Sequence, residues 1–390
     1  MKNVSIKVYR PTGEFINEWN DAVFDGFSKE INSGLGECII TLGKKFDNYT
    51  EDINIGNIIN ISISDKETTE IGNIIIYSGY ISTIEYTCNN SKENILVHVL
   101  GNYTKLSLDV LKDSSQVILY SDTTNGLSTT DPATEADIGL ILRAIIKRYR
   151  EETVNPMIFS NLSSIPIIGE TATYTISMKT YREAIDSIVS MLPSGYFWYC
   201  DENGIFSIKQ KPSSPTHTFE FGKHFSSIKI ERSLEKLRNF LLIWNGEPSG
   251  GVFSKYEDVL SISKYGRKFE YLVDYGINDT TSSDKIGAKF ISDNKNPSLK
   301  LICEIIDNSL DDNGYDIESI NPGDTCRFVG FNSALTNILE DNMLITKVDY
   351  LFNKATIEVQ LIKSGLVNWQ DKTSSKVKNL SSYNIPESYT

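Results

Sequence analysis

The sequence predicts a mainly β protein with an α+β insertion. Apolar residues alternate with polar ones through most of residues 1–110, helical spacing appears within residues 111–225, and short β segments return after that. With 390 residues, the chain is long enough for two to three domains with cores of their own. We therefore expect a first β domain at 1–110, the insertion at 111–225, a second β domain with a short helix at 226–365, and a polar tail at 366–390.

The first region has the pattern of a half-buried sheet. Isoleucines between residues 53 and 63 alternate with mostly polar neighbours, which places them on one buried face. A long strand is expected at 74–86, and turn residues at 88–94 connect it to a partner strand at 95–100. Short strands without intervening helices are typical of a sandwich or a barrel.

The insertion is predicted to contain two helices and a hairpin. Apolar residues at helical spacing indicate one helix within 136–152. Thr180 and Glu183 form a capping-box pattern that starts the second helix, and Pro193 ends it. Aromatic residues 196–199, a polar turn and residues 205–208 then predict a compact hairpin.

The third region returns to β patterning, with one short helix. That helix is expected at 283–293, ahead of Pro297. Strands are expected at residues 228–231, 239–245, 258–264, 268–275, 300–306, 324–329, 343–350 and 355–362.

Composition disfavours several function classes. There are 38 Lys and Arg against 51 Asp and Glu, a net charge of −13, which disfavours sequence-independent binding to nucleic acid and polybasic attachment to membranes. Residues 1–10 alternate like a strand and lack the apolar core of a signal peptide. The richest apolar run, 74–77, is too short to span a membrane. The five scattered cysteines contain no C-x-x-C pair, so we expect buried, reduced thiols.

Few residues are available for catalysis or metal binding by imidazole, because the chain has only three histidines. His217 and His224 are seven residues apart across a Pro-rich break, which does not resemble a metal-binding pair, and we interpret them as surface or interface residues. His98 sits among apolar strand residues and is expected to be structural. No G-x-S-x-G motif exists. We therefore predict no catalytic residue, no cofactor and no metal site.

The densest acidic cluster lies within residues 304–324, a span with no basic residue. Its oxygen ligands would suit calcium, but placing Gly314 at the sixth loop position puts Ser309 first and Ile320 twelfth, and neither is the required carboxylate. A solvated turn at 312–314 is the favoured interpretation. The cluster consists of Glu304, Asp307, Asp311, Asp312, Asp316, Glu318 and Asp324.

Four other patterns favour structural interpretations. The Gly34-Leu35-Gly36 segment predicts a tight turn rather than a phosphate cradle. The glycines at 246, 250 and 251 predict a flexible loop. The aromatic run 196–199 is expected in the core rather than in a sugar groove, and the basic helix face at 143–150 is expected to be solvated or to contact a subunit rather than DNA.

One set of segments resembles the tail hub proteins of bacteriophages and related contractile injection particles. Residues 228–246 resemble the start of that family's second barrel, a closing hairpin at 343–361 matches its usual end, and the stretches 55–57 and 76–81 resemble its first barrel. Each motif is weak alone, and their order carries the resemblance, which spans most of residues 1–365. The signature residues are Asn239, Gly246, Tyr265, Gly266, Arg267, Pro322, Gly323 and Asp324.

The resemblance implies a structural role and no enzyme activity. It implies two β-barrel domains of tail-hub type per chain, and a homotrimer whose barrels form a pseudo-sixfold ring between a hexameric tail tube and a threefold tip. The implied partners are a tail tube or distal tail protein, a tip, spike or central fibre protein, and a tape measure protein. DNA would pass only in transit, and no membrane anchor is expected. Such a protein assembles in the bacterial cytoplasm and belongs to the virion tail.

Two other function classes stay open. The 20 Tyr, 17 Phe and 4 Trp residues would suit a carbohydrate- or receptor-binding tail protein. Abundant carboxylates would permit a cell-wall hydrolase that uses two of them. For the hub, we expect part of the net charge of −13 to line a channel that repels DNA phosphate.

Overall fold

The computed structural model is mainly β, as predicted. The predicted tail at 366–390 lies outside the described residues, as do Asp311, Asp312, Gly250 and the turn at 312–314. The structure describes residues 3–43, 52–64, 74–89, 92–111, 117–118, 120–122, 126–128, 136–161, 163–176, 179–246, 251–307, 315–331, 342–351 and 354–360.

The N-terminal region forms a run of antiparallel strands, and the expected long hairpin is present as β6 and β7. A 3₁₀ helix, η2 (Asn102–Ser107), follows it. The strands are β1 (Asn3–Tyr9), β2 (Phe15–Glu18), β3 (Val23–Glu30), β4 (Leu35–Leu42), β5 (Ile58–Ser64), β6 (Ile74–Asn89) and β7 (Lys92–Gly101).

The C-terminal region contributes a second group of strands to the same sheet. β16 pairs with β22 in parallel, and the other pairs of this group are antiparallel. The short helix η3 (Ile317–Ser319) precedes β22. The strands are β16 (His217–Glu220), β17 (Ile228–Ser233), β21 (Ser298–Ile306), β22 (Thr325–Val329), β23 (Met343–Leu351) and β24 (Lys354–Gln360).

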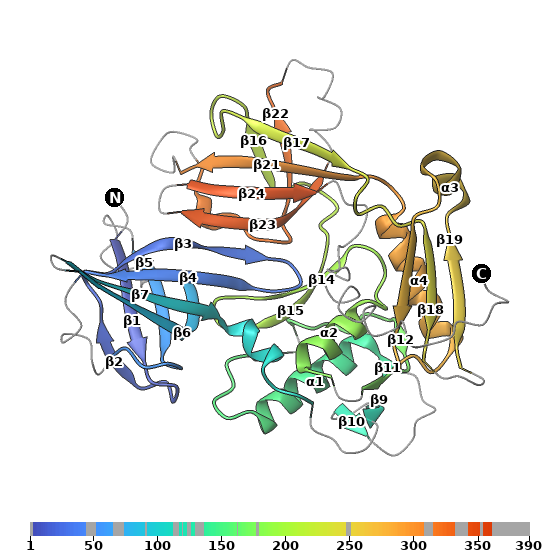
Figure 1. Ribbon diagram of the computed structural model, residues 1–390, viewed down its shortest axis with the longest axis horizontal. Helices are drawn as coiled ribbons and strands as arrows, with labels where there is room; N and C mark the ends of the chain where they lie inside the picture. The colour runs from blue at the N-terminus through green and yellow to red at the C-terminus, as the bar shows by residue number, and fades with distance from the viewer. Residues whose placement is uncertain are drawn as a thin grey trace.

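The two strand groups join into one sheet of 13 strands through β3 and β23 (Figure 1). In this seam Phe27 pairs with Tyr350, and Lys29 pairs with Val348. The order is β17-β21-β24-β23-β3-β4-β7-β6-β5-β1-β2, with β22 paired to β23 and β16 paired to β22. The path through the described strands is therefore open at both ends. The two predicted barrels therefore stay a prediction, while the mainly β class is confirmed.

The first hydrophobic core belongs to both strand groups. Ile61 and Val97 from the N-terminal strands share one buried cluster with Phe328 and Ile357 from the C-terminal strands. Alternate positions of each strand face this core, which is why the period-2 pattern was visible in the sequence. The seam is thus a continuous hydrogen-bonded and packed connection between segments more than 300 residues apart.

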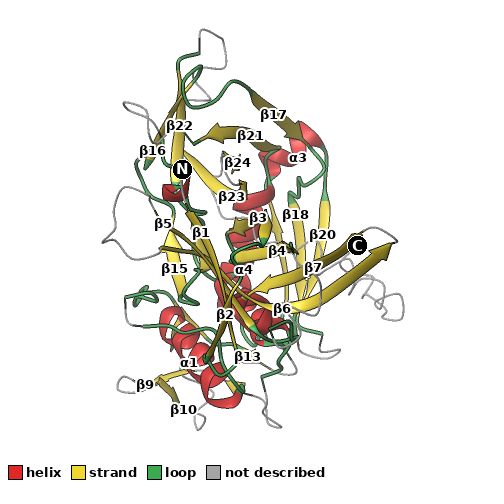
Figure 2. Cartoon of the chain, turned by 90° about the vertical axis from the view of Figure 1, so that its left-hand side faces the viewer, coloured by secondary structure: helices red, strands yellow, loops and turns green. Residues whose placement is uncertain are grey.

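The insertion contains the predicted helices and hairpin: α1 (Ile138–Glu152), α2 (Tyr181–Val189), β14 (Tyr196–Cys200) and β15 (Phe206–Gln210). The capping box of Thr180 and Glu183 is formed, and Asp137 caps α1. Figure 2 shows α1 at one end of the molecule and β16, β17 and β22 at the other. The insertion also holds the short strands β8 (Val117–Ile118), β9 (Tyr120–Asp122), β10 (Gly126–Ser128), β11 (Ala136–Asp137), β12 (Thr171–Ala172) and β13 (Thr175–Ile176).

A separate three-stranded sheet packs beside the insertion. It consists of β19 (Phe253–Glu257), β18 (Phe240–Trp244) and β20 (Phe269–Val273), with α4 (Thr280–Asn294) against it. Leu241 of β18 and Ile286 of α4 share a second core with Ile145 and Ile185 of the insertion. The third predicted region thus contributes to both cores, and its boundary at residue 226 stays a prediction.

The strand expected at 258–264 is a helix, α3 (Val259–Tyr265). The prediction was wrong because Leu260 and Ile262 alternate with serines, which imitates the period of a strand. The Asp258 side chain accepts a hydrogen bond from the Ser261 backbone N–H and so caps the start of the helix. The strand prediction did not include this cap. Strands β16 and β19 were not predicted, and α4 begins three residues earlier than expected.

The cysteine prediction is confirmed for Cys38, Cys200, Cys303 and Cys326, which are buried thiols, and is wrong for Cys88, which is exposed. Burial raises the pKa of the Cys303 thiol to about 12. Within the described ranges, no helix combines the length and the apolar character needed to cross a membrane.

Candidate functional site

The eight signature residues fall into two groups on different elements. Asn239 and the 265–267 segment meet where β18, α3 and β20 begin or end, and Gly246 follows β18. The Pro322–Asp324 turn precedes β22 in the large sheet. Figure 1 shows α3 and β18 on the right of the molecule and β22 at its top.

Asn239 is a fully buried amide with several hydrogen bonds. Its Nδ2 donates to the Gly266 carbonyl at 2.9 Å and to Ser261 Oγ at 3.1 Å, while its Oδ1 accepts from the Lys268 N–H at 2.7 Å. One side chain therefore fixes the end of α3 and the start of β20 against β18. A buried amide satisfied this completely acts as a structural tie, and no polar atom of it is left to bind a ligand.

The other residues of this group complete the turn. Gly266 ends α3 with a φ of 77°, a value that favours glycine. The Arg267 guanidinium lies 4.6 Å from the Phe240 ring centroid. Gly246 has a φ of 85°, and a Cβ there would lie 2.1 Å from the Tyr275 ring.

The Pro322–Asp324 turn lies where three parts of the chain meet. Gly323 has a φ of 92°, and a Cβ there would lie 2.3 Å from the ring of Phe197, which is fully buried in β14. Phe197 packs against Ile31, after β3, and Leu344, in β23. The Gly323 N–H also donates to the Ile345 carbonyl at 2.8 Å. The turn thus seats the insertion hairpin against the seam.

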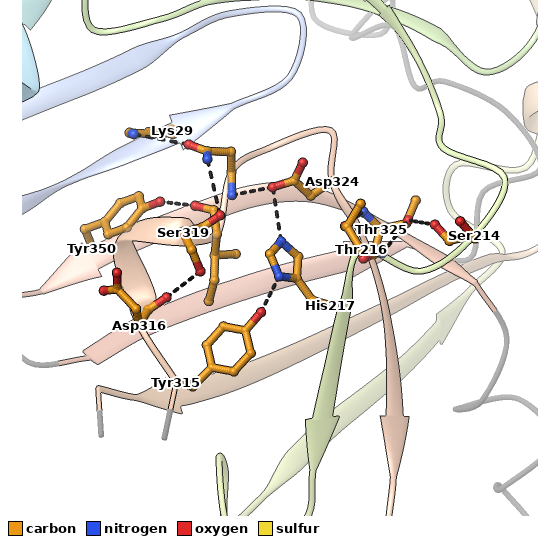
Figure 3. Close-up of polar contacts among 12 residues, drawn as sticks. Lys29, Ser214, Thr216, His217, Tyr315, Asp316, Ser319, Asp324, Thr325 and Tyr350 are labelled. Atoms are coloured by element: carbon orange, nitrogen blue, oxygen red, sulfur yellow. Dashed lines mark hydrogen bonds and ion pairs between the residues drawn. The ribbon is translucent and has the colours of Figure 1, made fainter. Parts of the chain in front are cut away.

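Asp324 holds this turn through its carboxylate (Figure 3). Its Oδ2 accepts from the Asn321 N–H at 2.9 Å and lies 3.1 Å from His217 Nε2. Because a carboxylate only accepts, His217 Nε2 carries the proton, and in the neutral ring Nδ1 then accepts from the Tyr315 hydroxyl. Burial raises the pKa of Tyr315 to about 12, so the phenol is protonated at neutral pH. This relay orients a turn and offers no activated nucleophile.

Two neighbouring features extend this junction. Thr325 Oγ1 donates to the Ser214 carbonyl at 2.8 Å, and Thr216 Oγ1 donates to the Thr325 carbonyl at 2.6 Å, which aligns β16 with β22. The Tyr350 hydroxyl donates to the Ile320 carbonyl. The turn is therefore tied to both of the strands that flank it, β16 and β23.

Lys29 is nearly fully buried at the seam. Its Nζ lies 3.3 Å from Glu202 Oε2 and 3.4 Å from Asn321 Oδ1, and 5.2 Å from the Tyr350 ring centroid. It therefore links β3 to the β14–β15 turn and to the residue before Pro322. A buried ammonium is costly unless it is paired, so these contacts hold its position.

A cavity of about 110 Å³ opens beside Lys29, and we name it the seam pocket. Its walls are mostly apolar, with Phe24 and Phe27 from β3 and Tyr350 from β23. Glu202 and Glu318 supply carboxylates in its lining. An apolar cavity with a few polar groups is the usual form of a small binding site.

The histidine predictions have mixed outcomes. His217 and His224 are buried, so the expectation of surface or interface residues was wrong, because both rings pack on Tyr315 within an aromatic cluster. His224 Nδ1 accepts from the Glu220 N–H at 3.0 Å. His98 lies between two carboxylates, with Nδ1 2.6 Å from Glu37 and Nε2 3.3 Å from Glu85.

Part of the acidic cluster converges. Single carboxylate oxygens of Asp307, Asp316 and Glu318 lie within 4.8 Å of one another. Such oxygens are the ligands that hard cations prefer. Exposed acidic groups also gather without an ion, and Asp316 is exposed. The grouping makes this part of the surface strongly negative.

The aromatic run and the basic helix face are both engaged within the chain. Phe197, Trp198 and Tyr199 are buried, which agrees with the predicted core role. Arg143 Nε donates to the Ile165 carbonyl at 2.6 Å, and the Arg150 guanidinium lies over the Phe159 ring. These arginines brace the insertion, which gives the basic face a structural role.

Sequence reasoning missed Lys29 and Phe197 as parts of the junction. A signal existed for Lys29: it lies at an inward position of β3, between the buried residues Phe27 and Ile31. A lysine in that register indicates a buried charged contact. Phe197 carried no such signal, because its contact with Gly323 joins residues 126 positions apart.

The structure is similar to solved tail proteins over nearly its whole length. The 43 kDa tail protein of prophage MuSo2 from Shewanella oneidensis matches with a TM-score of 0.60 and 14% identity, over 92% of this chain and 98% of that one. The tail protein from Neisseria meningitidis matches with 0.58 and 9%, over 92% and 96%. Prophage tail protein gp18 from Listeria monocytogenes matches with 0.54 and 10%, over 96% and 99%.

These matches concern the fold. No protein-family model matches the sequence, and no curated protein matches it either. The chain has the fold of phage tail proteins, and the resemblance inferred from the order of the sequence segments is confirmed at that level.

Proposed function

We propose that the chain is a structural tail hub protein of a phage or phage-like particle. In this role it forms a homotrimer that joins the hexameric tail tube to the tip or spike. The observation that carries the proposal is the fold likeness to three tail proteins, which covers at least 92% of this chain and at least 96% of each of theirs. A likeness over so much of both chains favours a shared architecture over a shared single domain.

The contacts between the strand groups and the insertion suit a rigid structural adaptor. The seam between β3 and β23 joins the two strand groups by backbone hydrogen bonds, and the Pro322–Asp324 turn anchors the insertion to them. Such connections keep two barrel-like units in a fixed orientation, which a pseudo-sixfold ring of three chains requires. The open ends of the sheet at β17 and β2 would be covered by neighbouring subunits.

In the proposed function the chain has a structural role and no catalytic one. Its partners would be a tail tube or distal tail protein, a tip, spike or central fibre protein, and a tape measure protein. DNA or effectors would cross the ring in transit, past a wall that carries part of the net charge of −13. The protein would assemble in the bacterial cytoplasm and end in the virion tail.

Native mass spectrometry with negative-stain imaging tests this proposal. We expect a species of three chains and a ring-shaped particle with a central channel. A monomer at micromolar concentration would contradict it. A channel wall that is neutral or basic, with the acidic residues on the outer rim, would remove the electrostatic part alone.

A further inference from the structure

One corner of the molecule exposes apolar side chains beside cations. Val259 and Leu260, at the start of α3, are 68% and 83% exposed. Lys264 and Lys268, at and after the end of α3, are exposed as well. We name Val259, Leu260, Lys264, Arg267 and Lys268 the α3 corner. Two adjacent leucine-sized side chains in water at a protruding helix are typical of a contact surface.

The acidic residues near the α3 corner are already paired within the chain, so the corner keeps a positive charge. The pairs join Lys255 to Glu257 at 3.2 Å, Lys295 to Asp258 at 2.8 Å and Arg238 to Glu270 at 2.9 Å. The positive charge of this corner contrasts with the net charge of −13 of the whole chain. Its chemistry suits a partner surface that is apolar in the centre and acidic at the rim.

The seam pocket has that complementary chemistry. Its lining is mostly apolar, with Lys29 already paired to Glu202, and Glu318 in the lining converges with Asp307 and Asp316. A cavity of roughly 150 Å³ can hold a benzene ring, so a pocket of about 110 Å³ accommodates a branched aliphatic side chain. Leu260 is such a side chain.

We propose that the α3 corner of one copy docks into the seam pocket of a second copy. Leu260 fills the pocket, and Lys264 and Lys268 lie against the carboxylates at its rim. The inference rests on the proposed homotrimer and adds which surfaces form its interface. Because two different surfaces meet, the contact is heterologous, the type from which a closed ring of three is built.

The position of the two surfaces agrees with such a ring. Figure 1 shows α3 at the right edge of the molecule, while the seam of β3 and β23 lies toward the left. Surfaces at separate places on a subunit can each contact a different neighbour. If one surface lay next to the other, a copy could not bind two neighbours at once.

A single substitution tests the apolar half of the contact. Leu260→Asp places a charge in the proposed apolar pocket, and we expect the concentration at which the full-length trimer half-dissociates to rise at least about tenfold. Val154→Asp is the matched control, because Val154 is 85% exposed and belongs to neither surface. Native mass spectrometry over a dilution series reads both, and circular dichroism verifies that both variants are folded.

A charge exchange tests the polar half. Lys264→Glu with Lys268→Glu should weaken the trimer, and so should Glu318→Lys with Asp307→Lys. All four changes in one chain restore opposite charges at every interface, so we expect recovery of most of the lost affinity. Recovery requires that the two surfaces face each other, which a fold defect would not produce.

The outcomes separate the inference from the proposal beneath it. If Leu260→Asp stays as trimeric as wild type, or if the fourfold exchange shows no recovery, the docking inference is wrong while the hub proposal stands. If the wild type is a monomer, both are wrong. Loss of the trimer in Leu260→Asp, with Val154→Asp unaffected, supports the contact.

Discussion

The two hydrophobic cores connect distant segments by different means. The first core joins the N-terminal and C-terminal strand groups by a strand ladder, and the Pro322–Asp324 turn fastens the insertion to it. The second core joins the insertion to the β18–β20 sheet by side chains, such as Lys289, whose Nζ donates to the Val189 carbonyl at 2.9 Å. The signature residues divide between the two cores, so each core can be perturbed by itself.

Because of this difference, the two cores are sensitive to substitution at different kinds of position. A strand ladder distributes its strength over many backbone hydrogen bonds, so the sensitive positions in the first core are those where backbones or rings approach closely. The second core is also apolar but has buried polar groups at its edge, such as Lys289, so it is sensitive to the loss or the titration of single side chains as well. Four substitutions test this difference between the two cores, and they are given from the largest expected effect to the smallest.

Gly323→Ala should give the largest loss. A Cβ there meets the buried Phe197 ring at 2.3 Å, and the φ of 92° is unfavourable for alanine. We expect a loss of about 4 kcal/mol in the free energy of unfolding from overpacking and backbone strain together. Denaturant unfolding at one fixed protein concentration measures it.

Gly169→Ala is the control for that substitution. Gly169 has a φ of 83° with nothing within 4 Å of an added Cβ, so it reports the backbone strain alone. We expect a loss of about 1 kcal/mol there. Equal losses at the two glycines would contradict the close approach at the turn.

Lys289 should make the second core sensitive to pH. Burial lowers the pKa of Lys289 to about 8, with Asp293 opposing the shift. The unfolded side chain, with a pKa of about 10.4, binds more protons than the folded one between these values, so the free energy of unfolding rises with pH from about 8 to 10.4. We expect a gain of about 3 kcal/mol across that window relative to Lys289→Met, measured by unfolding at several pH values.

The same variant supplies the check. Lys289→Met has no ammonium to titrate, so its stability should change less over this pH range than that of wild type. If the free energies of unfolding of the two proteins changed with pH in parallel, burial would not lower the pKa of Lys289 as described.

Asn239→Leu should cost about 2 kcal/mol. The change keeps the side-chain size but leaves the Gly266 carbonyl and the Lys268 N–H without their partner. Unfolding curves measure the loss, and Asn203→Ala at an exposed turn should change stability by less than about 0.5 kcal/mol. A loss of stability at Asn239 no larger than the loss at Asn203 would contradict the structural role of the Asn239 side chain.

Lys29→Met should have the smallest effect, about 1 kcal/mol, although the lysine is buried. Its contact with Glu202 is long, 3.3 Å, and Glu202 keeps access to water that can solvate it after the change. A double-mutant cycle with Glu202→Gln isolates the pair. A loss above 3 kcal/mol would mean that the seam depends on this charge as much as on its ladder.

Local patterns predicted much of the fold, and contacts between distant segments escaped them. The Thr180–Glu183 capping box and the 196–208 hairpin are written within a few residues, so both were predicted. The seam between β3 and β23 has no local signal, because the partners are more than 300 residues apart. The α3 helix was missed because its serines imitate strand alternation and the cap at Asp258 outweighs that pattern.

The signature segments illustrate the same limit at the level of the site. Glycines 266 and 323 could be recognised as turn residues from sequence, since both need a positive φ. The close approach of Gly323 to the ring of Phe197 in the insertion could be seen only in the structure. The sequence singled out Pro322, Gly323 and Asp324 as part of the family resemblance, and their role as a junction came from packing.

Electron microscopy of the purified full-length protein is the strongest test of the proposed hub and its interface. We expect a threefold ring around a channel, with α3 of each copy seated at the β3–β23 seam of its neighbour. A monomeric particle would contradict the hub itself, and a ring with α3 facing solvent would contradict the interface assigned to it.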